Sequence, residues 1–296
     1  MTQIRAISAG TSAETERFTG TVHSVFSRAC NIALDDGRLL TLLAAEQGNA
    51  PNAVRLETPP GFTFDRALRT GERIGCRAGV MRFGQAGISV RLASAHPWRH
   101  DLDGLCADLR APSVFAAWRA ARRCLRRHET ANPATDLTGL SVPPGRALAL
   151  WRAARAQDID AGAAALRGLV GCGMGLTPAG DDIVVGFFAG LRATMCADDK
   201  RMAYCTALGE NARTLADRTN PISGAYLVHA ANGGFAEPIA RLASAIADGA
   251  GEDAIVRAAR PALGVGATSG EDGVRGLLLG FAAWGRLSGN EGARRG

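Results

Sequence analysis

The spacing of apolar residues along the chain changes near residue 100. Between residues 18 and 92, apolar and polar residues alternate in short runs separated by turn sequences such as Asp35-Asp36-Gly37. This pattern is typical of strands joined by tight turns. After residue 100, apolar residues recur at every third or fourth position, as on one face of a helix. We therefore predict an α+β protein, with a β-rich barrel or sandwich in residues 1–100 and an all-helical domain in residues 101–296.

The same patterns predict the individual elements. Strands are expected at 19–26, 31–34, 38–43, 53–57, 73–81 and 87–92. Helices are expected at 102–110, 112–128, 145–155, 159–170, 178–195, 199–216, 221–232, 235–248, 252–260 and 269–287. Residues 1–16 show no periodicity and should form a loose arm, and residues 130–144, with their three prolines, a long loop.

A glycine-rich loop precedes the helix predicted at 178–195. Gly173, Gly175 and Gly180 allow a backbone with positive φ that comes close to a ligand, and Thr177 followed by proline is typical of an N-cap. Free N–H groups at a helix start favour an anion such as phosphate or a carboxylate. Asp182 then begins a series with Gly186 and Gly190 on one face of the helix.

A second copy of this pattern lies ninety residues later. Ser269-Gly270-Glu271-Asp272, followed by Gly276 and Gly280, aligns without a gap with the segment that begins at Ala179. Thr268 precedes it, and Ser269 with Asp272 has the spacing of a capping box. The match indicates a possible internal duplication, in which two helix starts pack about a pseudo-twofold axis.

A third polar cluster covers residues 217–224. Asn220 is expected to be an N-cap before a proline, with the hydroxyls of Thr219 and Ser223 near free amides and Arg218 available to neutralise charge. Ordinary capping explains such a sequence as well. The interpretation as an anion site is favoured because three similar helix starts occur in one domain.

Three aspartates at the helix starts are the candidate catalytic residues: Asp181, Asp182 and Asp272. Acidic residues in a first turn also stabilise the helix dipole, by ~0.3 to 1 kcal/mol, which is the simpler explanation. As functional groups they could orient an amide nitrogen, or Asp182 and Asp272 could bind Mg²⁺ beside a phosphate, although no dedicated metal site is predicted. A P-loop and a dinucleotide-binding fingerprint are both absent, which argues against ATP hydrolysis and nicotinamide redox chemistry.

The composition of the chain excludes several classes of protein. The net charge of +6 comes from dispersed arginines, and aromatic residues make up only 5% of the chain, which argues against a nucleic-acid-binding protein. No apolar run is long enough to cross a membrane, so we expect a cytoplasmic protein. The seven cysteines form no Cys-x-x-Cys pair and are odd in number, so we expect reduced thiols. One predicted helix carries a basic face, formed by Arg119, Arg122, Arg123, Arg126 and Arg127.

These motifs resemble the AllH family, named for a subunit of oxamate carbamoyltransferase in allantoin degradation. The resemblance covers most of the chain and rests on the loop from Gly173 to Asp182, on 219–223 and on 266–272 with Gly276. It also includes Ser24-Val25-Phe26, Asn31 and Asp36-Gly37 near the N-terminus. The glycine loop departs from the family's sequence at two positions, with Met174 in place of proline and Ala179 in place of serine.

The resemblance implies an enzyme subunit of purine catabolism that works with partner subunits and interconverts oxalurate plus phosphate with oxamate plus carbamoyl phosphate. Donors for a phosphate and a carboxylate would come from the helix starts at 177–180, 220–223 and 268–270, without a protein nucleophile. Two alternatives remain open from the residues themselves. One is a non-catalytic subunit whose basic face docks a partner, and the other is a metabolite-sensing module.

Overall fold

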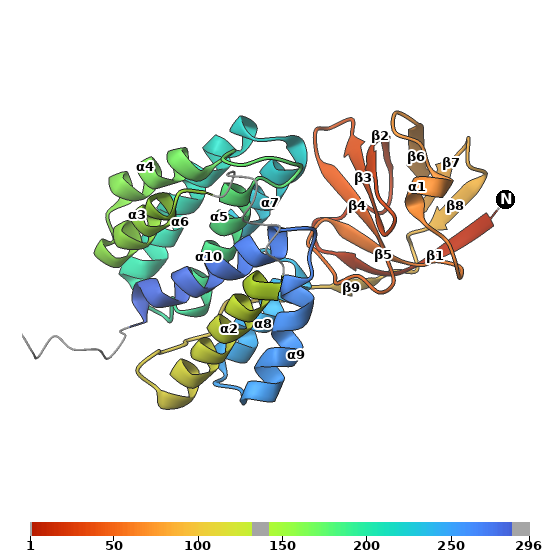
Figure 1. The fold of residues 1–296 in the computed structure, drawn as a ribbon. Helices are drawn as coiled ribbons and strands as arrows, with labels where there is room; N and C mark the ends of the chain where they lie inside the picture. The colour runs from red at the N-terminus through yellow and green to blue at the C-terminus, as the bar shows by residue number, and fades with distance from the viewer. Residues whose placement is uncertain (1, 132–141, 286–296) are drawn as a thin grey trace, which may run out of the picture. The chain divides into compact units, whose positions relative to one another are not determined.

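The computed structural model describes residues 2–131 and 142–285 (Figure 1). The chain divides into two compact units, residues 1–100 and 101–296. The first unit is a β-barrel and the second is helical. Among the described residues, no helix combines the length and the apolar character needed to cross a bilayer.

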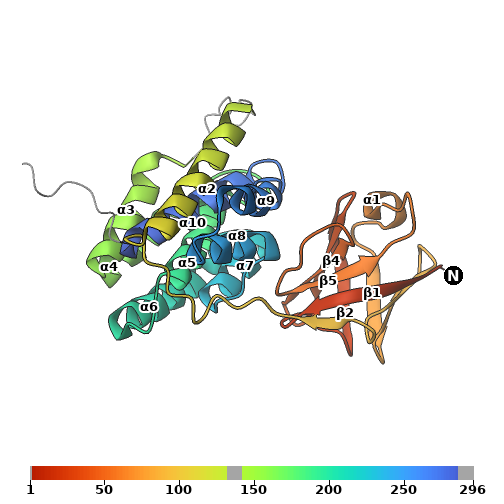
Figure 2. The same cartoon turned by 90° about the horizontal axis from the view of Figure 1, so that it is seen from below.

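The strands of the N-terminal unit are β1 (Thr2–Gly10), β2 (Phe18–Val25), β3 (Ala29–Leu34), β4 (Leu39–Ala44), β5 (Ala53–Glu57), β6 (Arg73–Arg77), β7 (Val80–Phe83), β8 (Ile88–Arg91) and β9 (His96–Trp98). A single helical turn, α1 (Phe64–Ala67), lies between β5 and β6. The sheet order is β5-β4-β3-β2-β6-β7-β8-β1. Because β1 also pairs antiparallel with β5, these eight strands close into a barrel, and β9 adds to β1 (Figures 1 and 2).

The first strand is the main correction to the sequence prediction for this unit. Residues 1–16 were expected to form a loose arm, but β1 pairs with β8 along its first half, with β9 at its end and with β5. A register shift between Ala6 and Ser8 interrupts its alternation, which is why no period of two was evident. The single strand predicted at 73–81 is β6 and β7, since Ala78 and Gly79 both have positive φ and reverse the chain.

Two N-terminal residues that carry the family resemblance belong to a hydrogen-bonded row across β2, β3 and β4. Asn31 is buried and donates from Nδ2 to Ser24 Oγ at 3.0 Å. Its Oδ1 accepts from Thr41 Oγ1 at 2.9 Å. Ser24 and Thr41 are the register partners of Asn31 on the two neighbouring strands, so the row ties these strands together.

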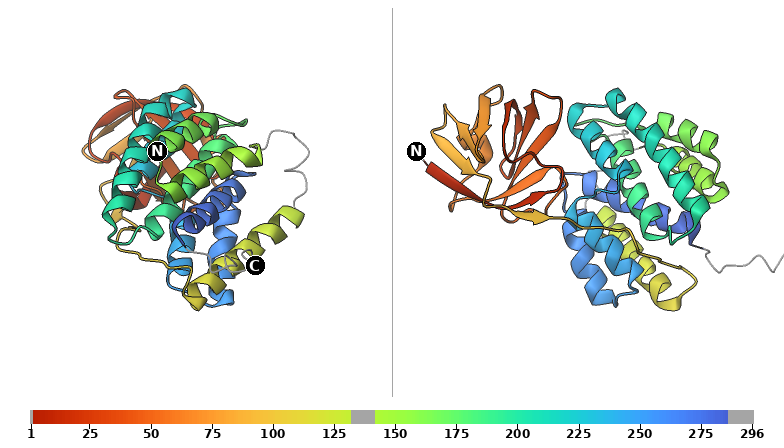
Figure 3. Two further views of the ribbon diagram at one scale, coloured as in Figure 1. Left: turned by 90° about the vertical axis from the view of Figure 1, so that its left-hand side faces the viewer. Right: turned by 180° about the vertical axis from the view of Figure 1, so that it is seen from behind.

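The helices of the C-terminal unit are α2 (Pro112–Ala131), α3 (Pro144–Ala156), α4 (Ile159–Leu169), α5 (Ala179–Ala193), α6 (Asp199–Leu215), α7 (Pro221–Ala231), α8 (Glu237–Ala247), α9 (Glu252–Leu263) and α10 (Ser269–Trp284). A short 3-10 helix (Ala216–Arg218) connects α6 to α7. The helices α5 and α10 pack along each other at the centre, with α3, α4 and α6 on one side and α2, α8 and α9 on the other (Figures 1 and 3).

The helix predicted at 102–110 is wrong. This segment is an irregular strap in which Gly104 has a φ of 90°, a conformation incompatible with a right-handed helix. Leu102 and Leu109 are nevertheless buried in the helical core. Their spacing therefore resembles that of a helix although the segment is irregular. The predicted loop at 130–144 lies largely outside the described residues. Each of the other predicted helices is present, with ends that differ by a few residues.

The strap also carries a disulfide bond that the sequence analysis missed. Cys106 is bonded to Cys196, which follows α5, and the amide of Ala107 donates to the carbonyl of Ala193 at 2.9 Å. The prediction of fully reduced thiols is therefore wrong for these two residues. The two cysteines are ninety positions apart, and nothing in their local sequence indicates the pairing.

Candidate functional site

The two central helices approach each other more closely than side chains would allow. A Cβ atom added at Gly186 on α5 would overlap the carbonyl oxygen of Gly273 on α10. A Cβ atom added at Gly276 on α10 would overlap the carbonyl oxygen of Ile183 on α5. One turn further on, the same exchange involves Gly190 with Leu277 and Gly280 with Phe187. Only glycine permits this approach of two backbones.

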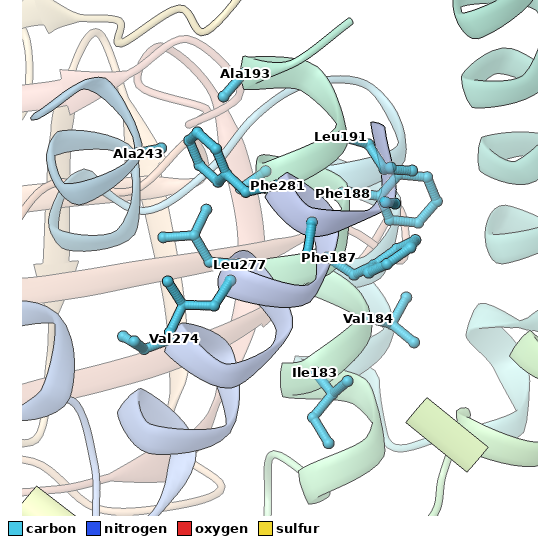
Figure 4. Close-up of a cluster of buried hydrophobic side chains, with 14 of the residues drawn as sticks. Ile183, Val184, Phe187, Phe188, Leu191, Ala193, Ala243, Val274, Leu277 and Phe281 are labelled. Atoms are coloured by element: carbon cyan, nitrogen blue, oxygen red, sulfur yellow. The ribbon is translucent and has the colours of Figure 1, made fainter. Parts of the chain in front are cut away.

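These contacts are reciprocal under the ninety-residue offset. Ile183 corresponds to Gly273 and Phe187 corresponds to Leu277, so each helix offers its partner the same glycines and the same carbonyl groups. Apolar side chains fill the space beside the glycine contacts, among them Phe187, Leu277 and Phe281 (Figure 4). The arrangement is that of two helix starts related by an approximate twofold axis, as expected for an internal duplication.

The loops that lead into the two helices meet through their hydroxyl groups. Thr177 Oγ1 and Ser269 Oγ lie 2.5 Å apart, a hydrogen bond between residues ninety-two positions apart in sequence. The bond joins the glycine loop before α5 to the start of α10. The carboxyl groups in the first turns of both helices are thereby brought to one place in the helical unit.

Asp182 lies at this junction. Burial raises the pKa of its carboxyl group well above the ordinary value, and the negative charges of Asp272 and Asp181 raise this pKa further, whereas hydrogen bonds with Ser269 and Thr177 oppose the rise. Its Oδ2 atom is buried and has no hydrogen-bond partner among the described residues. Asp182 is therefore poised to hold a proton at a pH where an exposed aspartate is ionised.

Asp272 on α10 occupies the corresponding position and has a cationic neighbour. It is 7% exposed, and burial raises its pKa to about 6, although the Arg275 guanidinium opposes the rise. Arg275 donates to Asp272 Oδ1 and, at 2.8 Å, to Glu129 Oε1 at the end of α2. It also lies 3.5 Å from Glu271 Oε1. One guanidinium thus serves three carboxyl groups.

Glu271 is the least satisfied member of this cluster. It is only 4% exposed, and burial raises its pKa. Its Oε2 atom has no hydrogen-bond partner among the described residues. A buried acceptor without a donor costs free energy in the isolated protein. Glu271 and Asp182 therefore each present one unused oxygen, from opposite helices of the pair.

Asp181 is occupied by the protein itself. It is 1% exposed, and its Oδ1 accepts from the amide of Gly171 at 2.8 Å. Its Oδ2 accepts from Thr219 Oγ1 at 2.6 Å and from Ser223 Oγ at 2.7 Å. Asp181 thus fastens the glycine loop to the start of α7, and it accounts for the hydroxyls that were expected to bind an anion.

The amides at the three helix starts are largely used within the protein. Gly180 N–H donates to the carbonyl of Cys172 at 2.8 Å, and Gly270 N–H donates to that of Val265 at 2.9 Å. Asn220 caps α7 as predicted, because its Oδ1 accepts from two amides of the first turn, each at 3.1 Å. In this conformation these four N–H groups are not free for an anion.

Two details of helix capping differ from the sequence prediction. α5 begins at Ala179 with Pro178 at the N-cap, so Thr177 lies before the helix and its hydroxyl bonds to Ser269 instead. α10 begins at Ser269 with Thr268 at the N-cap, and no side chain caps it. The capping box predicted for Ser269 and Asp272 is therefore wrong, since Ser269 contacts the other loop.

The remaining predicted site residues lie around the same junction or on its surface. Gly173 and Gly175 have φ values of 122° and 91°, as expected for a glycine loop. A Cβ atom at Gly173 would lie 2.7 Å from the amide nitrogen of Ala179, so this glycine allows the loop to fold onto the helix start. Arg218 and Thr268 are exposed.

Among the described residues, no group of three or more His, Cys, Asp or Glu side chains is arranged so that it could hold a metal ion. The Mg²⁺ binding considered for Asp182 and Asp272 would therefore rest on two carboxyl groups. His229, further along α7, is half-buried, and burial lowers its pKa.

Sequence reasoning missed Glu129, Glu271 and Arg275 as members of the cluster. A signal existed for Arg275, which follows Glu271 and Asp272 by four and three positions and therefore lies on the same helix face. Glu129 gave no comparable signal, because α2 precedes α10 by well over a hundred residues. Only the packing of α2 beside α10 brings it to the site.

Comparison with protein families connects both units to one family. Residues 169–281 match the family described as oxamate carbamoyltransferase subunit AllH, and this description supports a subunit of that enzyme. Residues 5–97 match the AllH family N-terminal domain. No solved structure matches the chain. The two matches together cover most of the sequence, and the first includes the glycine loop and the carboxyl groups of both helix starts, so the chain belongs to the AllH family.

Proposed function

We propose that this protein is the AllH-type subunit of an oxamate carbamoyltransferase, and that the junction of α5 and α10 takes part in the reaction. The observation that carries the proposal is the pairing of Asp182, half-buried with its Oδ2 atom fully buried, and Asp272, which is buried. Both carboxyl groups have raised pKa values, and they lie on helices that only glycine contacts allow to meet. Perturbed carboxyl groups of this kind are typical of proton-transfer sites.

The proposed reaction includes a proton transfer in which such a group can take part. When a phosphate oxygen attacks the terminal carbamoyl carbon of oxalurate, the bond from that carbon to the inner nitrogen breaks, and carbamoyl phosphate and oxamate form. The inner nitrogen gains a proton as it leaves, and the attacking hydrogen phosphate loses one. A carboxyl group with a pKa of about 6, as for Asp272, can give or accept a proton near neutral pH.

The surrounding residues have supporting roles in this proposal. Asp181 acts as a positioning residue, because it fixes the glycine loop and the start of α7 around the junction. Arg275 balances the charge of the cluster when Asp272 is ionised. Arg218 and Thr268, which are exposed near the helix starts, are candidates for contact with phosphate.

The test is turnover by the chain together with its partner subunits. Carbamoyl phosphate formed from oxalurate and phosphate is followed by phosphorus NMR for the native protein and for Asp182→Asn and Asp272→Asn. Because a general acid–base group contributes roughly 10²–10⁴-fold, we expect kcat to fall at least about 100-fold in Asp272→Asn. Asp253→Asn, at an exposed aspartate in the first turn of α9, is the matched control and should retain native turnover.

Two results would contradict the proposal. One is the absence of carbamoyl transfer in the assembled native complex. The other is native turnover in both junction variants, which would instead favour a non-catalytic subunit whose glycine contacts serve only to pack the helices. Circular dichroism of each variant, compared with Asp253→Asn, separates a loss of chemistry from a loss of folding.

A further inference from the structure

At the junction of α5 and α10, two carboxyl oxygens without partners among the described residues indicate what this site recognises. Asp182 Oδ2 and Glu271 Oε2 are buried, and neither accepts a hydrogen bond from the described residues. They come from the first turns of α5 and α10, which the Thr177–Ser269 hydrogen bond joins. Asp272 connects them, because it interacts with Asp182 across the helix pair and shares Arg275 with Glu271.

A ligand that satisfies such oxygens brings hydrogen-bond donors. An anionic group beside Asp182 would face the carboxyl groups of Asp181 and Asp272, and the backbone amides at Gly180 and Gly270 that could offset them are already bonded to carbonyl groups. The charged side chains facing Asp182 are Asp181 on its own helix and Asp272 from α10. Arg275 is engaged by Asp272, Glu271 and Glu129. The junction therefore suits an uncharged group that is rich in N–H donors.

We propose that the carboxyl cluster of Asp182, Asp272 and Glu271 binds the ureido or primary amide end of the substrate, through Asp182 Oδ2 and Glu271 Oε2, and does not bind its phosphate or carboxylate. A neutral carboxyl group and a primary amide are complementary, since the O–H donates to the amide oxygen while the carboxyl C=O accepts from N–H. Burial favours the neutral form of Asp182, which supports this pairing.

This inference rests on the proposed function and assigns one part of the substrate to one place. The ureido end of oxalurate carries a terminal NH₂ and an inner N–H. Carbamoyl phosphate keeps the terminal NH₂, and oxamate keeps the inner nitrogen as its own NH₂, so each product retains part of the group that the cluster would bind. The phosphate and the carboxylate would then be held by residues outside the cluster. In this proposal, the centre of the junction binds the N–H donors of an amide, whereas the sequence predicted that the glycine loop binds an anion.

The experiment measures the binding of two isosteric monoanions to the full chain by calorimetry. Oxamate carries NH₂ where pyruvate carries CH₃, so the pair differs only in the amide donors. Because a buried acceptor left without a donor is unfavourable, we expect the native chain to bind oxamate at least about tenfold more tightly than pyruvate. Carbamoyl phosphate and acetyl phosphate form a second pair with the same difference and the same expectation.

Variants assign the preference to the cluster. Asp182→Leu should reduce the oxamate preference to within about threefold of unity, because it removes both hydrogen-bonding atoms. Asp182→Asn keeps one donor and one acceptor and should retain most of the preference. Glu271→Leu should weaken the binding of oxamate more than the binding of pyruvate. Asp253→Asn should leave both affinities unchanged, since it lies on the exposed start of α9.

Equal binding of oxamate and pyruvate by the native chain would overturn the inference, as would an unchanged preference in Asp182→Leu. Binding of Mg²⁺ alone that Asp182→Leu abolishes, without an oxamate preference, would also overturn it, because the cluster would then be a cation site. If the complex transfers carbamoyl groups while oxamate and pyruvate bind alike, only the inference fails. If selective binding depends on Asp182 but no transfer occurs, only the proposed function fails.

Discussion

The two halves of the helix pair place an acidic residue at the same position and use it differently. Asp181 on α5 and Glu271 on α10 correspond under the ninety-residue offset, and both are buried. Asp181 accepts three hydrogen bonds, one from the glycine loop and two from residues in α7 and just before it. Glu271 has Arg275 on one oxygen and no partner on the other. A near-symmetric frame thus holds one acid whose two oxygens are both hydrogen-bonded and one acid with an oxygen that has no partner among the described residues.

The largest expected effect is the difference in free energy of unfolding between two single variants, one at each acid. Asp181→Ala leaves the amide of Gly171 and two hydroxyls without their acceptor, so we expect the free energy of unfolding to fall by about 4 kcal/mol, at ~1–3 kcal/mol for each buried donor left unpaired. Glu271→Gln keeps the shape and removes a charge that burial disfavours, so its effect should be within about 1 kcal/mol. Urea unfolding of both variants measures the comparison.

Equal destabilisation by the two substitutions would contradict this division of roles. Ser223→Ala provides an intermediate control, since it removes one of the donors to Asp181 and leaves the other two. It should cost about 1 kcal/mol, the net contribution of one ordinary hydrogen bond.

Substitutions of the glycines test the close packing of α5 against α10. Gly276→Ala would drive a methyl group into the backbone of α5, so we expect a loss of about 3 kcal/mol, at the upper end of ordinary overpacking. Gly273→Ala is the matched control on the same helix, because its added Cβ would meet only the carbonyl oxygen of Asp182, at 3.9 Å. This control should gain up to about 1 kcal/mol from helix propensity.

Thermal unfolding of the two alanine variants reports both signs in one experiment. Destabilisation by Gly273→Ala as large as that by Gly276→Ala would show that the close approach of backbones is not what the glycines provide. The reciprocal variant Gly186→Ala should match Gly276→Ala, because each added methyl group meets the equivalent carbonyl group of the other helix.

Local sequence signals predicted most of the helical unit and the meeting of its two central helices. Apolar spacing predicted α2 to α10, and Asn220 before a proline predicted the cap of α7, since both depend on residues a few positions apart. The ninety-residue repeat also anticipated the meeting of α5 and α10, because matched glycines on matched faces leave few other ways to pack.

What sequence reasoning missed depends on contacts between distant segments. β1 closes the barrel by pairing with β5 and β8, so its order comes from strands encoded some fifty to ninety residues later. The disulfide of Cys106 with Cys196 and the ion pair of Arg275 with Glu129 are equally non-local. The amides at the helix starts were expected to be free, but they are hydrogen-bonded. Their carbonyl acceptors are placed by the loop geometry, which composition does not specify.

Controls aside, the smallest of the three main effects concerns the protonation of Asp272. Its pKa rises from 3.8 to about 6 in the folded protein, so the folded state binds the proton more tightly than the unfolded state. Stability from this group is fully present below about pH 4 and is lost as the pH rises through about 6. Asp272→Asn does not titrate there. The unfolding free energy of the native protein, minus that of the variant, should therefore fall by ~2 kcal/mol between about pH 4 and pH 7, at 1.36 kcal/mol per pKa unit.

Urea unfolding at several pH values measures this difference, with Gly273→Ala as a control that shifts stability by a similar amount at every pH because it changes no titrating group. A difference that increases with pH would mean that Arg275 dominates over burial and holds Asp272 ionised. Asp272 would then lack the proton that the proposed reaction uses near neutral pH. The same titration thus decides whether the α10 half of the junction is suited to proton transfer or resembles Asp181 in serving the structure.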